Sequence, residues 1–179
     1  MATAIMSALP SGFRRDHGVP IYVHEADAAM ARGETKKNVG MGPMSIGPFL
    51  RFMWYAGRRG GLRTTPIKEV RTFTDGDTLD LPGSPRIIRI PGHTPGSVAI
   101  HVPSVDALFV GDALTTGNVL TGATGPQPAP FTMDPALAMA SLSKLEAVPA
   151  TWVLPGHGPP WSGGSSEAMR LVRAAAQSA

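Results

Sequence analysis

Apolar and polar positions in the first third of the chain predict one short strand and two helices. A β-rich run at residues 19–23 follows Gly18 and predicts a strand. Residues 25–32 predict a helical turn or two that ends at Gly33. Apolar residues then repeat at spacings of three and four, as on one face of a helix, at Phe49, Phe52, Met53 and Ala56. We expect this face to pack into the core, with a substrate-covering lid as the alternative.

From Lys68 onward the pattern changes to short strands separated by turn residues. Four β-rich runs predict strands, at residues 68–73, 86–90, 97–102 and 107–110. The sequence Asp75-Gly76-Asp77 predicts a hairpin turn after the first of them. We expect these strands to pair as a largely antiparallel sheet.

The C-terminal half adds helices around one more strand. Residues 117–130 are dense in Gly and Pro and predict a loop. Asp134 followed by Pro135 is typical of a helix start, and the helix is expected to run to about Val148. A last strand is predicted at residues 151–154. The closing helix is expected from Ser166, with its buried side formed by Ala168, Leu171, Val172 and Ala175.

The composition favours a single globular domain. The chain has 179 residues, of which 42% are hydrophobic and 16% charged. No stretch approaches the roughly 18 unbroken apolar residues that a membrane-spanning helix requires. The first ten residues lack the charged start and long apolar centre of a secretory signal. We therefore expect a cytoplasmic protein with no membrane partner.

Cysteine usage and charge narrow the chemistry further. The chain has no cysteine, which excludes disulfides, thiolate zinc sites and a cysteine nucleophile, so nitrogen and oxygen atoms must hold any metal. Arginines cluster at residues 51, 58, 59 and 63 in a chain of net charge +3. Such a cluster is expected to be a solvated helix face, with an anion or nucleic-acid site as the alternative. No nucleic-acid motif accompanies it.

Three segments share one plan, in which an apolar strand and a Gly precede a residue that can bind a metal. They are IIRIPGH, ALFVGD and TWVLPGH, and they end at His93, Asp112 and His157. Glycine lets the backbone turn sharply, so the next side chain can point off the edge of the sheet. Each residue alone is more often a hydrogen-bonded turn residue or a helix cap. Together, two imidazoles and a carboxylate suit zinc, with iron or manganese as alternatives.

With GHTPGS around His93 and PGHG around His157, the sequence resembles the metallo-β-lactamase superfamily from Val19 to the C-terminus. The resemblance implies an α+β fold, a four-layer αββα sandwich, with residues 1–179 forming about the C-terminal three quarters of one domain. It also implies two metal ions, with His93 on the first, His157 on the second and Asp112 bridging them. His24 and His101 are not expected to be ligands.

The family's His-x-His-x-Asp-His signature does not occur in this chain. The nearest string is Gly12-Phe13-Arg14-Arg15-Asp16-His17, and we reject it because only Gly18 separates it from the strand that a whole helix should precede. Three of the seven ligands of a complete family site are therefore present. We expect an N-terminally incomplete fold, through a wrong start, a gene fragment or a truncated form.

Two functions follow as hypotheses from the resemblance. The first is a hydrolase that acts on a small ester, thioester, lactone or amide through metal-bound hydroxide, with activity in doubt for this chain. Residues 40–61 and 117–130 are expected to line its pocket. The second is a non-catalytic remnant of the fold that serves as a binding module, since exposed strand edges invite a partner. Oligomerisation stays open.

Overall fold

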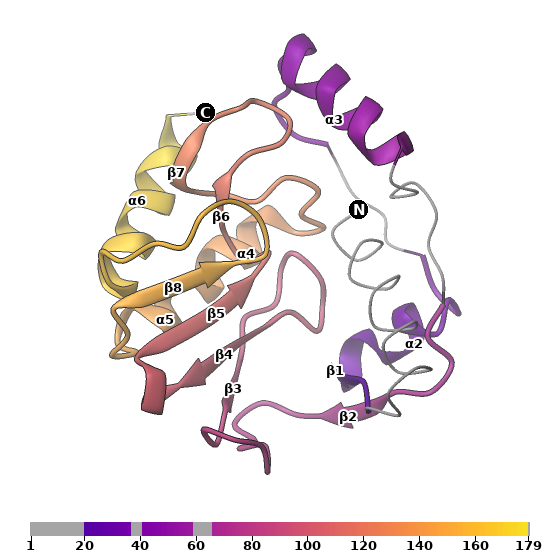
Figure 1. The fold of residues 1–179 in the computed structure, drawn as a ribbon, viewed down its shortest axis with the longest axis vertical. Helices are drawn as coiled ribbons and strands as arrows, with labels where there is room; N and C mark the ends of the chain where they lie inside the picture. Colours follow the sequence, from indigo (N-terminus) through magenta and orange to yellow (C-terminus); the bar gives the residue numbers. More distant parts are fainter. Residues whose placement is uncertain (1–19, 37–40, 59–65, 179) are drawn as a thin grey trace.

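The computed structural model describes residues 20–36, 41–58 and 66–178. Its main sheet has four strands in the order β3-β4-β5-β8 (Figure 1). These strands are β3 (Arg86–Arg89), β4 (Val98–Val102), β5 (Ala107–Gly111) and β8 (Trp152–Pro155). β4 is antiparallel to both of its neighbours, whereas β8 runs parallel to β5. The four predicted strands that form this sheet are confirmed to within about two residues.

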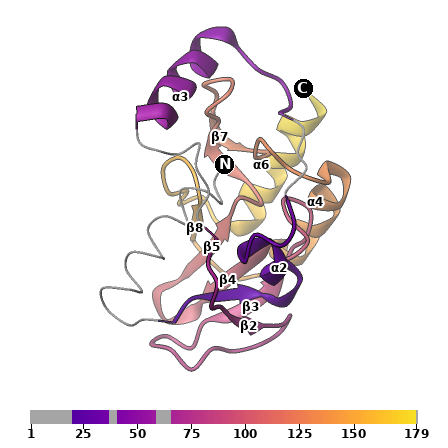
Figure 2. The same cartoon turned by 90° about the vertical axis from the view of Figure 1, so that its right-hand side faces the viewer.

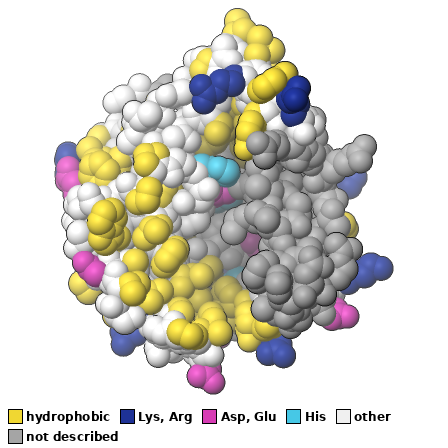
Figure 3. All heavy atoms as spheres, in the orientation of Figure 1, with side chains coloured by type: hydrophobic (Ala, Val, Ile, Leu, Met, Phe, Trp, Pro, Cys, Tyr) yellow, Lys and Arg dark blue, Asp and Glu magenta, His cyan; other side chains and the backbone are white. Residues whose placement is uncertain are grey.

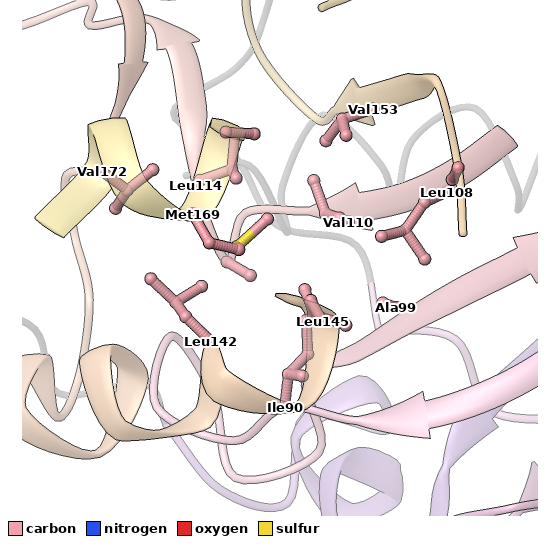
Figure 4. Close-up of a cluster of buried hydrophobic side chains, with 13 residues drawn as sticks. Ile90, Ala99, Leu108, Val110, Leu114, Leu142, Leu145, Val153, Met169 and Val172 are labelled. Carbon is pink, nitrogen blue, oxygen red and sulfur yellow. The ribbon is translucent and has the colours of Figure 1, made fainter. Parts of the chain in front are cut away.

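One face of this sheet is covered by helices, which are α4 (Pro135–Ser141), α5 (Ser143–Glu146) and α6 (Ser165–Gln177). Alternate residues of the strands point to this face because successive side chains of a strand point to opposite sides. Sheet and helix side chains meet in one buried cluster (Figure 4) that includes Ala99, Leu108, Val110, Val153, Leu142, Leu145, Met169 and Val172. Burial of this apolar surface is the main source of stability in the C-terminal half.

The opposite face of the sheet is also apolar and is only partly covered. Phe109 is the register partner of both Ile100 and Leu154, so the three side chains form a row across β4, β5 and β8. Phe109 keeps 42% of its surface exposed and Trp152 keeps 47%. Large apolar side chains grouped on an open sheet face are typical of a surface that another layer or a partner covers.

The pairing predicted for residues 68–73 is wrong. The strand exists, as β2 (Arg71–Phe73), but it pairs in parallel with β1 (Tyr22–His24) and not with β3. After the turn, the backbone of residues 76–78 pairs with the start of β3 instead. Parallel strands need a long connection between them. Hydrophobic spacing along the chain contains no information about such a distant partner.

The carboxylate of Asp75 stabilises this turn through contacts with Arg89 and Lys144. Its Oδ1 accepts a hydrogen bond from the backbone N–H of Arg89 at 2.8 Å, and Lys144 lies 3.6 Å from Oδ2. The backbone hydrogen bond is the main reason why the pKa of Asp75 lies below its ordinary value, and Lys144 lowers it further. The turn residue therefore links β3 to α5.

Two predictions for the segment after β5 need correction. Residues 117–130 are not wholly a loop, because β6 (Thr115–Gly117) and β7 (Thr124–Gln127) pair as an antiparallel hairpin. The single helix expected to Val148 is interrupted at Leu142, which ends α4 and precedes α5. The predicted start is confirmed, since Asp134 Oδ1 accepts a hydrogen bond from the N–H of Leu137 at 2.9 Å.

The N-terminal helices agree with their hydrophobic spacing. Residues 25–32 form η1 (Glu25–Asp27) and α2 (Ala28–Ala31), and the chain then turns at Gly33 with a φ of +78°. α3 (Ile46–Arg58) contains the predicted apolar repeat. Ala56 is buried and the other members of the repeat are half-buried. The repeat is therefore the more buried side of α3, but none of its members belongs to the main core cluster, so the expectation that this face packs into the core is confirmed only in part.

Candidate metal centre

His93, Asp112 and His157 lie together at one edge of the main sheet. Nε2 of His93 is 3.6 Å from Oδ2 of Asp112, and Nε2 of His157 is 3.7 Å from Oδ1. They meet because β3 and β8 both run in the direction of β5, so the carboxyl ends of all three strands lie at the same edge. The structure brings together all three residues that the sequence proposes.

Glycine residues before these side chains act in two different ways. Gly111 has a φ of +52° and Gly92 a φ of +138°, conformations that side chains with a Cβ rarely adopt. Gly156 instead provides space, since a Cβ there would collide with Oδ1 of Asp112. Its N–H donates to the carbonyl of Gly111 at 2.8 Å and joins the two strand ends. The sharp turns expected at these strand ends are therefore observed.

The three side chains differ in exposure. The side chains of His93 and Asp112 keep only 7% and 10% of their surface exposed, whereas that of His157 keeps 35%. Figure 3 shows histidine atoms at the surface of this face, next to atoms of an acidic side chain. A nearly buried carboxylate beside two imidazoles is an arrangement that suits a bound cation.

The orientation of the His93 ring follows from Thr132. Nδ1 of His93 lies 3.1 Å from Oγ1 of Thr132, and that hydroxyl donates its proton to the carbonyl of Ala129 at 2.8 Å. The hydroxyl must therefore accept from His93, which places the ring proton on Nδ1. Nε2, on the other side of the ring, faces the Asp112 carboxylate and is the nitrogen that a cation could contact. A ring nitrogen held in this way is typical of metal-binding histidines.

His157 is held through its backbone. Its carbonyl accepts hydrogen bonds from the N–H of Thr116 at 3.1 Å and from Oγ1 of Thr115 at 2.9 Å. Gly158, with a φ of +91°, packs so closely on Thr116 and Gly117 that a Cβ would overlap them. The sequence analysis did not identify these contacts, because it assigned no element to residues 115 and 116 and placed Gly117 in a loop.

Asp27 is a further residue that the sequence analysis did not identify. Its carboxylate accepts a 2.5 Å hydrogen bond from Oγ1 of Thr94 and a 2.8 Å bond from the N–H of Gly96. Both donors lie in the GHTPGS segment that begins next to His93. Asp27 thus ties η1 to the loop that carries a candidate ligand. No signal in the sequence marked Asp27, because its partner Thr94 lies 67 residues away along the chain.

Replacing Asp27 with Ala is expected to destabilise the fold by about 2–4 kcal/mol, because it leaves the part-buried N–H of Gly96 without its acceptor and removes the short hydrogen bond from Thr94, whose hydroxyl keeps only Ser97 Oγ at 2.9 Å. Asp27→Asn keeps an acceptor for the N–H of Gly96, so its free energy of unfolding should lie between that of Asp27→Ala and that of the parent. Urea unfolding followed by circular dichroism measures the difference. Asp80→Ala, at an exposed acidic position, is the matched control and should change little. Equal losses for Asp27→Ala and Asp80→Ala would contradict the role assigned to Asp27.

The other two histidines of the described chain have different surroundings. His24 is buried, accepts a hydrogen bond from the N–H of Ala26 on Nδ1 and packs edge-on against Phe73. His101 is buried within β4, where its register partner is Leu108. Neither residue follows a strand end at the edge that holds His93.

The spacing of the donor atoms fits metal ions. Two donors bound to one tetrahedral zinc lie about 3.3–3.5 Å apart, given bonds of about 2.0–2.2 Å. The separations of 3.6 and 3.7 Å are close to this value, and each imidazole faces a different oxygen of Asp112. Each pair supplies two donors. In keeping with this, no group of three or more His, Cys, Asp or Glu side chains in the described ranges is arranged to hold an ion.

Comparisons with known proteins agree with this fold. A hydroxyacylglutathione hydrolase of Ruegeria pomeroyi is 37% identical over 89 residues, which cover 47% of this chain and 31% of that protein. A metallo-beta-lactamase family protein of Thermus thermophilus has the same fold, with a TM-score of 0.62 at 20% identity over 94% of this chain and 56% of the other. TTHA1623, solved in a di-iron-bound form, has a TM-score of 0.54 at 27% identity, and the match covers 88% of this chain and 66% of that one.

The chain therefore spans less than a third of its curated relative and about half to two thirds of these solved structures. The expected α+β fold is confirmed. The sequence model of the Metallo-beta-lactamase superfamily matches residues 11–157, which include all three candidate ligands. The chain belongs to the metallo-beta-lactamase superfamily.

Proposed function

We propose that the protein takes part in metal-dependent hydrolysis of a small substrate with a reactive carbonyl group. The observation that carries this proposal is the Asp112 carboxylate, which presents one oxygen to each of two imidazoles. His93 and Asp112 would contact one ion, and His157 and Asp112 a second. When bound, such ions lower the pKa of a water molecule and polarise a carbonyl oxygen.

The residues of this chain have separate tasks in that scheme. Thr132 keeps the proton of His93 on Nδ1, so that Nε2 stays available as a donor to a cation. Asp112 would contribute one negative charge toward the two cations. The limited exposure of His93 and Asp112 keeps bulk water away from their donor atoms, whereas His157 lies on the open side where a substrate can approach. Shielding from water strengthens each electrostatic contact.

Among the candidate substrates, an acyl compound is favoured by the relative named hydroxyacylglutathione hydrolase. The proposal covers esters, thioesters, lactones and amides. Zinc is the proposed metal because it accepts nitrogen and oxygen donors in a tetrahedral arrangement. Iron is the alternative, since TTHA1623 was solved in a di-iron-bound form, and manganese accepts the same donors. A cytoplasmic location stays part of the proposal.

The second candidate function is a binding module without catalysis. It is favoured by the two donors per ion among the described residues and by the open apolar row of Phe109, Ile100 and Leu154. This alternative predicts that metal has no effect on folding.

Thermal unfolding with and without metal separates the two candidates. Chelator-treated protein is melted alone and with zinc, iron(II) or manganese, and the metal content is measured by mass spectrometry. If the site binds zinc, a concentration of 100 times Kd adds about 2.7 kcal/mol and raises Tm by about 5–10 °C. Hydrolysis of thioester, lactone and β-lactam substrates is then assayed with the metal that stabilises most. An unchanged Tm with every metal favours the binding module.

A further inference from the structure

Helix α3 exposes an apolar stripe that nothing in the described structure covers. Ile46, Leu50 and Trp54 follow one another at spacings of four, so they lie on one side of the helix. They keep 78%, 60% and 63% of their surface exposed. Single exposed apolar residues are common on proteins, but a continuous row of them usually marks a binding surface.

The stripe is separate from the face that packs on the protein. That packing face includes Phe52, whose ring lies 6.0 Å from the ring of Phe131, and buried Ala56. At the start of the helix, the N–H of Ser45 donates to the carbonyl of Leu120 at 2.9 Å. The helix is thus attached by one side and directs the stripe outward. Figures 1 and 2 both show α3 at one end of the molecule, apart from the main sheet.

Positive charge surrounds the stripe. Arg51 and Arg58 lie on the same helix, and the guanidinium of Arg58 stands 5.1 Å from the ring centre of Trp54. Figure 3 shows hydrophobic and Lys or Arg side chains together at this end. Residues 35–68 contain seven Lys or Arg and no Asp or Glu. Because the whole chain carries +3, the remainder carries −4, so the positive charge is concentrated in the stretch of sequence that contains α3.

We propose that α3 is a docking surface for an anionic lipid bilayer. The stripe would enter the boundary between headgroups and acyl chains while the arginines contact lipid phosphates, which is the usual arrangement of basic amphipathic helices at membranes. A second copy of the chain fits less well because two positive surfaces would face each other. A nucleic acid would leave the apolar stripe in water. The proposal does not depend on the metal centre.

This inference revises the expectation of no membrane partner, which rested on the lack of a spanning segment. None of the helices in residues 20–36, 41–58 and 66–178 is long and apolar enough to cross a bilayer. Docking by α3 needs no such helix, since the protein would lie on one leaflet.

Vesicle sedimentation with the full chain tests the proposal. The parent should bind vesicles of equal parts phosphatidylcholine and phosphatidylglycerol and should bind pure phosphatidylcholine far less. Leu50→Asp should weaken binding about tenfold or more, because it places a charge in the apolar stripe. The double variant Arg51→Gln with Arg58→Gln should weaken vesicle binding about 30-fold, at about fivefold per arginine. Added salt should also weaken the binding of the parent, because it screens the attraction between the arginines and the lipid phosphates.

Matched controls separate this surface from general stickiness. Val105→Asp, in η2 (Pro103–Val105), changes an equally exposed apolar residue, and Arg86→Gln removes an exposed arginine from β3. Both should bind like the parent. Circular dichroism checks that each variant folds. If Leu50→Asp does not fold, Ile46→Gln replaces it as the variant that disrupts the apolar stripe. The proposal is overturned if the parent does not bind anionic vesicles, if the controls lose as much as the α3 variants, or if Leu50→Asp instead abolishes a dimer seen by ultracentrifugation.

Discussion

Asp112→Asn is expected to lower the affinity of the protein for zinc by more than about 100-fold. Loss of a residue that only supports a metal ligand costs about 10–100-fold, and Asp112 faces both imidazoles directly. Asparagine keeps the size of the side chain but removes its charge and replaces one oxygen by an NH2 group, which cannot bind a cation. Competition with a chromophoric chelator measures the affinity, and the zinc-to-protein ratio measures the number of ions.

The control for this prediction is Asp80→Asn, which removes a carboxylate from an exposed position. It should bind zinc like the parent protein. Urea unfolding of both variants without metal shows whether the affinity change reflects the site or a loss of folding. Zinc binding by Asp112→Asn at parental affinity would show that the carboxylate is not a ligand, and the proposal of metal-dependent hydrolysis built on it would then be wrong.

Gly92→Ala is expected to destabilise the protein by about 3–6 kcal/mol, enough to prevent folding in many domains of this size. A φ of +138° strains any residue with a Cβ, and a Cβ at this position would overlap the backbone of Ala138 in α4. The Gly92 carbonyl also accepts a hydrogen bond from the N–H of Asp134 at 2.9 Å. Moving the turn away from α4 would lengthen that bond and displace His93.

The matched variant is Gly125→Ala in β7. Gly125 also has a positive φ, +89°, but open space surrounds the position of its Cβ. A Cβ at residue 125 would meet only the backbone strain, so the free energy of unfolding is expected to fall by about 1 kcal/mol. Chemical unfolding of both variants measures the difference. Equal effects would mean that the contact with Ala138 adds nothing beyond strain.

The secondary structure was largely predictable because its signals are local. The strands of the main sheet, the cap at Asp134 and the packing face of α3 follow from alternation, turn chemistry and helical spacing. The sequence predicted a loop where β6 and β7 form a hairpin, because Thr124–Gln127 contains Gly and Pro. The backbone of β7 nevertheless pairs with that of β6. Propensity is a weak guide where pairing with a neighbouring strand decides the conformation.

The candidate site was predictable in its members but not in its support. His93, Asp112 and His157 each stand after a strand and a glycine, a pattern visible in the sequence. Asp27 and Thr132 lie in segments without a motif, and they act on Thr94 and His93 over 67 and 39 residues of chain. A hydrogen bond across that distance depends on where the fold places the two segments.

The sequence by itself therefore determined the strand ends, the glycine turns and the chemical type of the three candidate ligands. Only the tertiary structure decided that β3, β5 and β8 end at one edge, that β2 pairs with β1 and that Asp27 holds the loop after His93. Local periodicity specifies which residues turn inward. The partner of each strand and each polar group is selected by packing and hydrogen bonding between distant segments, which no local pattern contains.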